Sequence, residues 1–234
     1  MAKGFRNRLN ENLFEGKDAR IVWATAAYGY RLNNYTYNKS DHDSYYDEWH
    51  KETIPASISN RTCAYAALAE PDLLEDADYE LGEEVHQYFK GLTFKAIMGK
   101  LKTFEKSILE FVDIEDWGNN PLATYHFAQL VSLPASYHRN LEREKQDSRV
   151  RDANKEYIDD VGARIKVDAE VIRSVYSERW CTNYVTVITD SDQVAFFSYK
   201  QALKSGAKIR FTGTVKAHRD DGQTQFNRVK VLDE

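Results

Sequence analysis

Apolar residues repeat at helical spacing from position 79 to position 133. Leu81, Val85 and Phe89 fall on one side of a helix, and the same period resumes beyond Gly91. A glycine interrupts such a pattern because it adds backbone freedom and no apolar side chain. We therefore predict two amphipathic helices that are separated near Gly91.

Two shorter helices are predicted on either side of this pair. One covers residues 62–69 and stops before Pro71, because a residue that precedes proline is pushed out of the α region. The other begins with Asn120 as N-cap and Pro121 at the first helical position, and Pro134 is expected to end it.

The first sixty residues follow no single period. The pattern IVWATAAYGY, residues 21–30, predicts a strand or a short apolar segment. The stretch that continues to His50 is crowded with Tyr, Asn, Asp and Ser, and part of it is expected to order only on a partner.

Residues 163–232 instead alternate apolar and polar positions and are rich in Val, Thr, Ile and Phe. They divide into five predicted strands, with sequences ARIKVDAEVI, NYVTVIT, QVAFFSY, KIRFTGTVKAH and TQFNRVKVL. Five short strands with a small connector between the third and the fourth match the OB-fold, a partly open Greek-key barrel. An SH3-like barrel and an immunoglobulin-like sandwich are the alternatives, although a sandwich usually has about seven strands.

The predicted fold class is therefore α+β, with helices preceding an OB-like five-stranded β-barrel. We place an α-rich domain at residues 1–134, a densely charged linker or helix at residues 135–156, and the barrel at residues 157–234.

The chain of 234 residues is 42% hydrophobic, which is enough for a buried core. The formal net charge of −5 means that any contact with nucleic acid must rest on a local patch. Residues 160–234 provide one candidate, because they carry twelve basic and ten acidic side chains.

Several classes of protein are not expected. No run of 18 apolar residues is present, so no membrane span is predicted, and the start MAKGFRNRLN lacks the apolar region of a secretory signal. We therefore expect a cytoplasmic protein. Cys63 and Cys181 lie 118 positions apart without a CxxC motif, which favours neither a disulfide framework nor a zinc site.

Single-stranded nucleic acid is held by a positive groove and by aromatic rings on which bases stack, each stacked base contributing ~1–3 kcal/mol. If strand alternation is regular, it turns basic side chains of the first, fourth and fifth strands outward, and also Phe226. Tyr184 and Tyr199 on the second and third strands, and Trp180 on the loop before them, supply further rings. The predicted nucleic-acid-binding residues are Arg164, Lys166, Trp180, Tyr184, Tyr199, Lys208, Arg210, Lys216, Phe226, Arg228 and Lys230.

Each of these residues also has a structural interpretation. Basic side chains on a barrel are usually only solvated, and Asp168 and Glu170 share the outward row of the first strand. A β-bulge would turn Phe226 inward, which its three-residue spacing from Val229 would suit. Any single aromatic side chain can equally belong to the core.

The C-terminal motifs resemble those of a known domain. A Tyr precedes the Gly that opens the first strand, a G-x-V-K-x-H motif ends the fourth, and a T-x-φ-x-R-V-K motif forms the fifth. The positions are Tyr157, Gly162, Gly213, Val215, Lys216, His218, Thr224, Phe226, Arg228, Val229 and Lys230. This arrangement is similar to an OB-type domain found near the C-terminus of bacteriophage and mobile-element proteins of DNA metabolism. The resemblance covers about a third of the chain and implies association with DNA in replication or recombination. It carries over no metal site, because the upstream cysteine-rich site of such proteins has no counterpart here.

Sequence motifs of enzymes are mostly missing, since GxxxxGK[ST], GxGxxG, HExxH and GxSxG do not occur. The remaining candidate is DHDSYYDEWH, where residues from Asp41 to His50 would gather around a divalent metal ion. Their spacing matches no established site, so a polar loop is the favoured interpretation. We therefore expect neither catalysis nor a cofactor.

The leading hypothesis is a non-enzymatic protein that binds single-stranded DNA, or RNA, in phage or mobile-element replication or recombination. If the protein is phage-encoded, it would act in the host cytoplasm. Residues 1–134 would supply homo-oligomerisation, a protein-partner surface or further DNA contacts. The alternative is an adaptor or inhibitor whose barrel and acidic helical region bind a protein partner. A metal-dependent nuclease that uses the segment from His42 to His50 is a third hypothesis.

Overall fold

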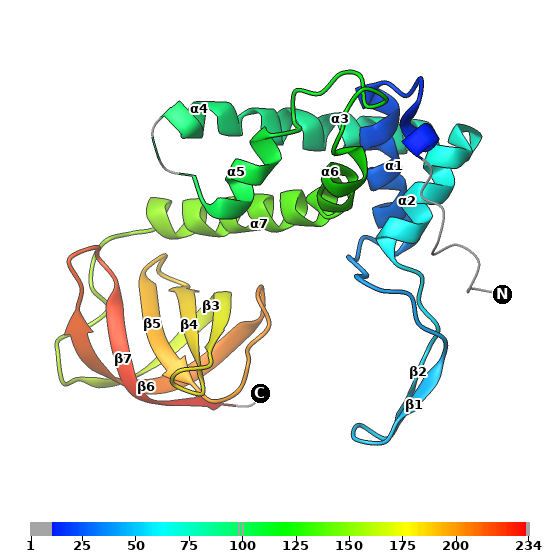
Figure 1. Cartoon of the computed structure of the whole chain (residues 1–234). Helices are drawn as coiled ribbons and strands as arrows, with labels where there is room; N and C mark the ends of the chain where they lie inside the picture. The colour runs from blue at the N-terminus through cyan, green and yellow to red at the C-terminus, as the bar shows by residue number, and fades with distance from the viewer. Residues whose placement is uncertain (1–10, 98, 100, 233–234) are drawn as a thin grey trace. The chain divides into compact units, whose positions relative to one another are not determined.

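The computed structural model describes residues 11–97, 99 and 101–232. The chain forms two compact units that divide between Asn140 and Leu141. This division falls inside α7 (Leu133–Asp152) (Figure 1). Residues 135–156, for which a charged linker or a helix is predicted, therefore lie mainly in a helix.

The N-terminal unit is built around three helices that contact one another. α1 (Ala19–Leu32) packs against both α2 (Asn60–Ala69) and α3 (Asp76–Lys90). The other helical elements of this unit are η2 (Glu11–Phe14), η3 (Pro71–Leu73), α4 (Leu92–Ile97), α5 (Thr103–Leu109), α6 (Ala123–Leu130) and the first turns of α7. Large aromatic side chains fill the core between them, among them Trp23, Phe89, Phe111, Trp117 and Phe127.

Residues 21–30 form a helix, and the prediction of a strand is wrong. Asp18 begins α1 as its N-cap, with its side chain accepting a hydrogen bond from the amide of Ile21. The helix is central to the unit and is buried on most sides, so its sequence lacks the polar stripe of a surface helix.

The other predicted helices are confirmed with changes at their ends. α2 and α3 appear as expected, and α3 ends at Gly91. The second amphipathic segment is divided into α4 and α5. The predicted start of α6 is wrong, because Leu122 is its N-cap and Pro121 lies before the helix. Asn120 instead accepts a hydrogen bond from the amide of Leu122. Pro134 does not end a helix but occupies the second position of α7, where proline is tolerated because the first amides of a helix have no intrahelical acceptor.

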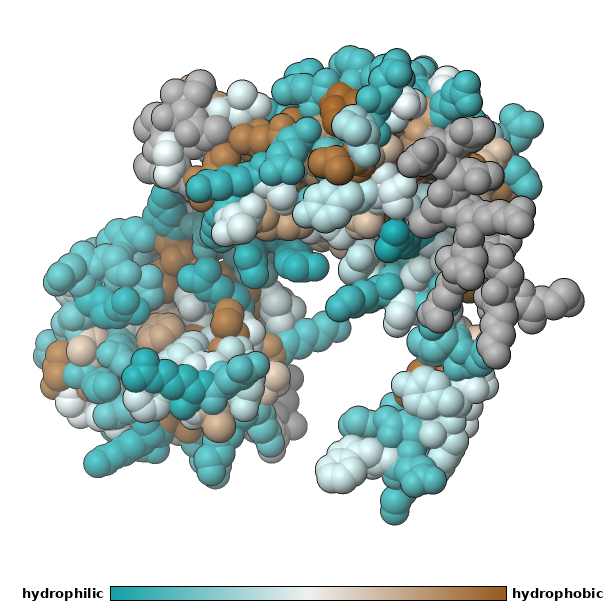
Figure 2. All heavy atoms as spheres, in the orientation of Figure 1, coloured by the Kyte–Doolittle hydropathy of each residue, from teal (hydrophilic) through white to brown (hydrophobic). Residues whose placement is uncertain are grey.

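A β-hairpin arm, residues 35–58, extends from the helical unit (Figure 1). Its strands are β1 (Tyr45–Asp47) and β2 (Glu52–Ile54), which pair antiparallel. Figure 2 shows the far end of the arm as pale and teal residues of intermediate and low hydropathy.

The C-terminal unit contains the predicted OB-like barrel. Its strands are β3 (Arg164–Ser177), β4 (Thr182–Thr189), β5 (Val194–Tyr199), β6 (Lys208–His218) and β7 (Thr224–Leu232). The barrel closes in the order β3-β4-β5-β7-β6, with β5 and β7 parallel and the other neighbours antiparallel. Its core contains Val185, Phe197, Phe211 and Phe226.

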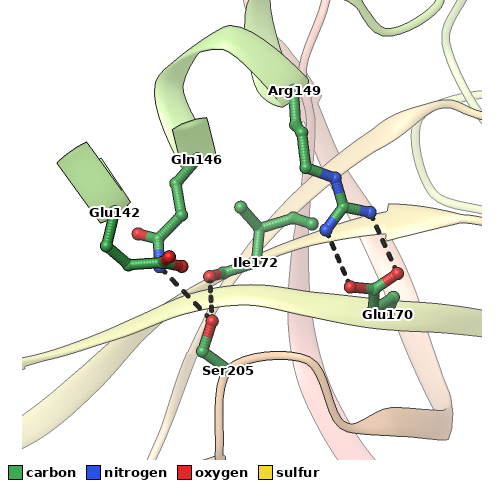
Figure 3. Close-up of polar contacts among 6 residues, drawn as sticks. All are labelled: Glu142, Gln146, Arg149, Glu170, Ile172 and Ser205. Atoms are coloured by element: carbon green, nitrogen blue, oxygen red, sulfur yellow. Dashed lines mark hydrogen bonds and ion pairs between the residues drawn. The ribbon is translucent and has the colours of Figure 1, made fainter. Parts of the chain in front are cut away.

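The second half of α7 packs on this barrel (Figure 3). Arg149 donates two hydrogen bonds to Glu170 of β3, at 2.7 and 2.9 Å. Gln146 donates to the hydroxyl of Ser205, which in turn donates to the carbonyl of Ile172 at 2.6 Å. Ile172 lies at a β-bulge and is buried against Ala153. The connector between β5 and β6 has no helix of its own, and α7 packs against it instead.

Among the helices in the described ranges, none combines the length and the apolar character that a bilayer crossing requires.

Candidate nucleic-acid interface

The outer surface of β4 and β5 carries a stacked pair of aromatic rings. Tyr184 lies opposite Ser198, and Thr186 lies opposite Phe196, so the side chains of Tyr184 and Phe196 share the outer surface. Their ring centroids are 5.7 Å apart and the planes differ by 14°. Val175 of β3 lies opposite Tyr184 and is exposed. We call Val175, Tyr184, Phe196 and Ser198 the aromatic face.

A cation lies over one of these rings. The guanidinium of Arg219, in the loop between β6 and β7, is 5.4 Å from the ring centroid of Phe196. The loop that holds it is ordered by two backbone hydrogen bonds, from the amide of Arg219 to the carbonyl of Gln223 and from the amide of Gly222 to the carbonyl of Arg219. In OB-folds, this loop and the second and third strands contact nucleic acid. The aromatic face therefore combines a stacked pair with a charge that matches a phosphate.

The loop between β3 and β4 presents a second exposed ring with a neighbouring cation. Trp180 is 62% exposed, and the guanidinium of Arg179 lies 5.1 Å from its ring centroid. Tyr176, at the end of β3, is also exposed. Large exposed apolar side chains that gather in one region mark an interaction surface more often than an ordinary solvated one.

Most of the predicted basic residues lie on a different part of the barrel, on β3, β6 and β7. Thr212 of β6 lies between Lys166 of β3 and Lys230 of β7 in the strand register. Arg164 is two positions before Lys166 on the same strand. We call Arg164, Lys166 and Lys230 the basic wall. None of the three forms an ion pair with a carboxylate that the structure describes.

Arg210 and Lys208 belong to the same strands but are partly neutralised. Arg210 binds both oxygens of Asp168, and this hydrogen bonding lowers the pKa of the Asp168 carboxyl. Lys208 lies opposite Glu170 in the strand register. The pKa of the Glu170 carboxyl is lowered mainly by its hydrogen bonds with Arg149. Lys216 and Arg228 are exposed at the two irregular positions of β6 and β7.

Two predicted stacking residues point into the barrel. Phe226 is only 2% exposed and packs edge-on against Phe211. The pairing of β6 with β7 shifts between Asn227 and Lys230, and Arg228 has φ of 50°. This bulge adds one residue and resets the alternation, so the expectation that Phe226 faces outward is wrong and the inward alternative is confirmed. Tyr199 is also misplaced, because it packs against the barrel core.

Phe196 takes the place of these two rings, although the sequence alone did not single it out. Because Phe196 and Phe197 are adjacent, one of them must face outward on a strand. Phe197 is fully buried, and Phe196 faces outward and is half-buried. Extending the alternation from Tyr184 through the strand register would have identified it.

Several residues of the C-terminal motifs close the barrel. The rings of Tyr157 and His218 stack, and the Tyr157 hydroxyl donates to the carbonyl of Arg219. The hydroxyl of Thr224 accepts from the amide of Ile158 at 3.1 Å. Gly162, with φ of 97°, donates to a backbone carbonyl of β6. These positions fix the segment before β3 onto β6 and β7.

No metal centre is formed by the described residues, because no group of three or more His, Cys, Asp or Glu side chains is placed to hold an ion. The segment from Asp41 to His50 lies in the arm, where Asp41 instead accepts hydrogen bonds from Ser59 and Thr62. No family model, no curated protein and no solved structure matches this chain.

Proposed function

We propose that this protein binds single-stranded DNA on the aromatic face of its barrel and catalyses no reaction. The observation that carries the proposal is the stacked pair Tyr184 and Phe196 with Arg219 over Phe196, on the strands that OB-folds use for oligonucleotides. Bases stack on such rings whatever their sequence, since every base has a π-face. Arg219 and Arg179 supply positive charge for the phosphates beside the rings.

The resemblance of the C-terminal motifs supports a setting in the replication or recombination of phage or mobile-element DNA, in the cytoplasm. The acidic balance of the whole chain limits non-specific attraction, so binding depends on this local arrangement. Only bases that are not paired with a second strand are free to stack on these rings. We therefore expect a preference for single strands over duplex DNA.

The test is fluorescence anisotropy with a labelled single strand, the matching duplex and a single strand of RNA. Tyr184→Ala and Phe196→Ala are each expected to weaken single-strand binding by about 5- to 150-fold, the equivalent of ~1–3 kcal/mol. Tyr125→Ala is the control, because Tyr125 is an exposed aromatic ring on α6 of the other unit. Circular dichroism of each variant checks that the fold is retained.

A salt series distinguishes phosphate contacts from other binding. For single strands the logarithm of affinity falls with the logarithm of salt concentration by about 0.7 per phosphate contact. Arg219→Gln is expected to reduce this slope. Absence of single-strand binding at low salt, or unchanged affinity in both ring variants, contradicts the proposal. Tighter binding of the RNA strand would change the substrate to RNA.

A further inference from the structure

The base of the arm is fixed firmly to the helical unit. The backbones of His42 and Ser57 exchange two hydrogen bonds, at 3.0 and 2.9 Å. Asp41 accepts from the amide of Ser59 and from the hydroxyl of Thr62, which ties the arm to the first turn of α2. The arm is therefore held in position from its base.

The far end of the arm has large side chains but little cover. Trp49 is 89% exposed, and Tyr45 and Tyr46 are also exposed. A two-stranded hairpin is marginal in water on its own. Aromatic side chains left outside the core of a folded protein commonly mark a surface that a partner covers.

The arm is also strongly acidic. It contains five carboxylates and two lysines, which gives a net charge of −3. Asp47 accepts hydrogen bonds from His50 and from the amide of Trp49, and these keep the pKa of its carboxyl below the usual range. This charge favours a basic partner for the arm over a nucleic acid strand.

The basic wall of the barrel has the complementary properties. Lys166 and Lys230 lie on either side of Thr212, and their charges are not matched by ion pairs in the described ranges. An arm docked on a second arm would bring two negative ends together, which charge repulsion opposes. We propose that the arm of one copy of this protein docks on the basic wall of a second copy, with Trp49 buried in the contact.

This contact differs from a symmetric patch-on-patch interface. The arm and the wall are different surfaces, so two copies can exchange arms in a closed two-fold dimer, or copies can add head-to-tail into a growing chain. The aromatic face lies on β4, β5 and the end of β3, whereas the basic wall lies at the start of β3 and on β7. The docked arm therefore leaves the aromatic face accessible, and assembly does not require nucleic acid.

Sedimentation velocity of the full chain over a concentration series, without nucleic acid, tests the proposal. The wild type is expected to associate as concentration rises and to dissociate at high salt. An arm variant, Asp43→Lys with Glu48→Lys, and a wall variant, Lys166→Glu with Lys230→Glu, are each expected to remain monomeric. Mixing the two variants is expected to restore association, because each arm then meets a wall of opposite charge.

Matched controls carry the same charge change elsewhere. Glu80→Lys with Asp72→Lys reverses two exposed carboxylates of the helical unit, and Arg143→Glu with Lys145→Glu reverses two exposed cations on α7. Both are expected to associate as the wild type does. The fluorescence of Trp49 gives a second signal, since a blue shift at high concentration should be absent from Trp49→Phe.

Three results would overturn the proposal. The first is a wild type that is monomeric at every concentration. The second is association that survives reversal of the arm. The third is a wall variant that still associates but no longer binds DNA, which would assign the wall to nucleic acid. No DNA is present in the sedimentation experiment. A failure of the docking proposal can therefore be told apart from a failure of the proposed DNA binding, which is measured by anisotropy.

Discussion

The rings of Tyr157 and His218 lie face to face, with centroids 4.0 Å apart and planes 3° from parallel. His218 also donates through Nε2 to the carbonyl of Asp159 at 2.7 Å. Tyr157 and Asp159 precede β3, whereas His218 ends β6. This pair therefore joins the entry of the first barrel strand to the end of the fourth.

Replacing His218 by Ala is expected to destabilise the barrel by about 1–3 kcal/mol, because both the stack and a hydrogen bond are lost. Tyr157→Phe keeps the stack and removes only the hydroxyl bond to Arg219, so about 0.5–1.5 kcal/mol should be lost. Hydrogen exchange of amides in β6 measures both effects. Equal losses in the two variants would mean that the ring stack contributes nothing.

Gly82 lies where α3 approaches α1 most closely. A Cβ atom at this position would be 2.8 Å from the amide nitrogen of Ala24, a backbone atom that cannot move aside easily. Gly82→Ala is therefore expected to destabilise the helical unit by about 1–3 kcal/mol. Gly91→Ala is the control, since Gly91 has a helical φ of −60° and a Cβ there would be 3.2 Å from the carbonyl oxygen of Tyr88, so a smaller loss is expected. Urea denaturation followed by circular dichroism compares the two variants.

Arg31 and Asp78 form a buried ion pair between α1 and α3. Asp78 is 1% exposed and accepts two hydrogen bonds from Arg31, at 2.8 and 2.9 Å, which raise the pKa of the guanidinium. Asp78→Ala should cost about 1.5–3 kcal/mol, because Arg31 loses two charge-assisted hydrogen bonds and keeps only the exposed carboxylate of Glu75. Glu75→Ala removes the exposed second carboxylate of Arg31, 3.2 Å away, and should cost about 1 kcal/mol or less. Similar losses of unfolding free energy in both variants would contradict this difference.

The contact of α7 with the barrel is expected to depend on pH. Hydrogen bonds from Arg149 lower the pKa of Glu170 in the folded protein. The contribution of this pair is therefore complete above the unfolded pKa of about 4.3 and is lost as pH falls through the lower folded value. Arg149→Ala should melt at a lower temperature than the wild type at neutral pH. The two melting temperatures should converge in acid, and a constant difference down to the lowest pH would exclude this mechanism.

The barrel was predictable because its strands and turns are each indicated by residues close together in the sequence. Alternation defines each strand, and turns such as Asp220–Gly222 lie between strands that pair directly. The choice between an outward and an inward Phe226 could not be made from alternation alone, because one inserted residue at a bulge reverses every side chain beyond it. The neutralisation of Arg210 depends on the register that places it opposite Asp168, forty-two positions away.

The helical unit was less predictable for reasons that concern its tertiary environment. α1 is surrounded by other helices, so neither of the two usual periods is visible in its sequence. The arm has little apolar alternation because both of its faces are largely exposed. In the candidate site, Trp180 and Tyr184 were predictable from residue type, whereas the position of Arg219 over Phe196 depends on how the barrel closes.

The place of β7 between β5 and β6 has a consequence for synthesis on the ribosome. β3, β4 and β5 can pair as soon as they emerge, but the free edges of β3 and β5 have no neighbours until β6 and β7 have been translated. Unpaired strand edges are sites at which nascent chains aggregate. The barrel can close only after residue 232 has left the ribosome, so we expect a slowly translated or truncated chain to depend on chaperones at this stage.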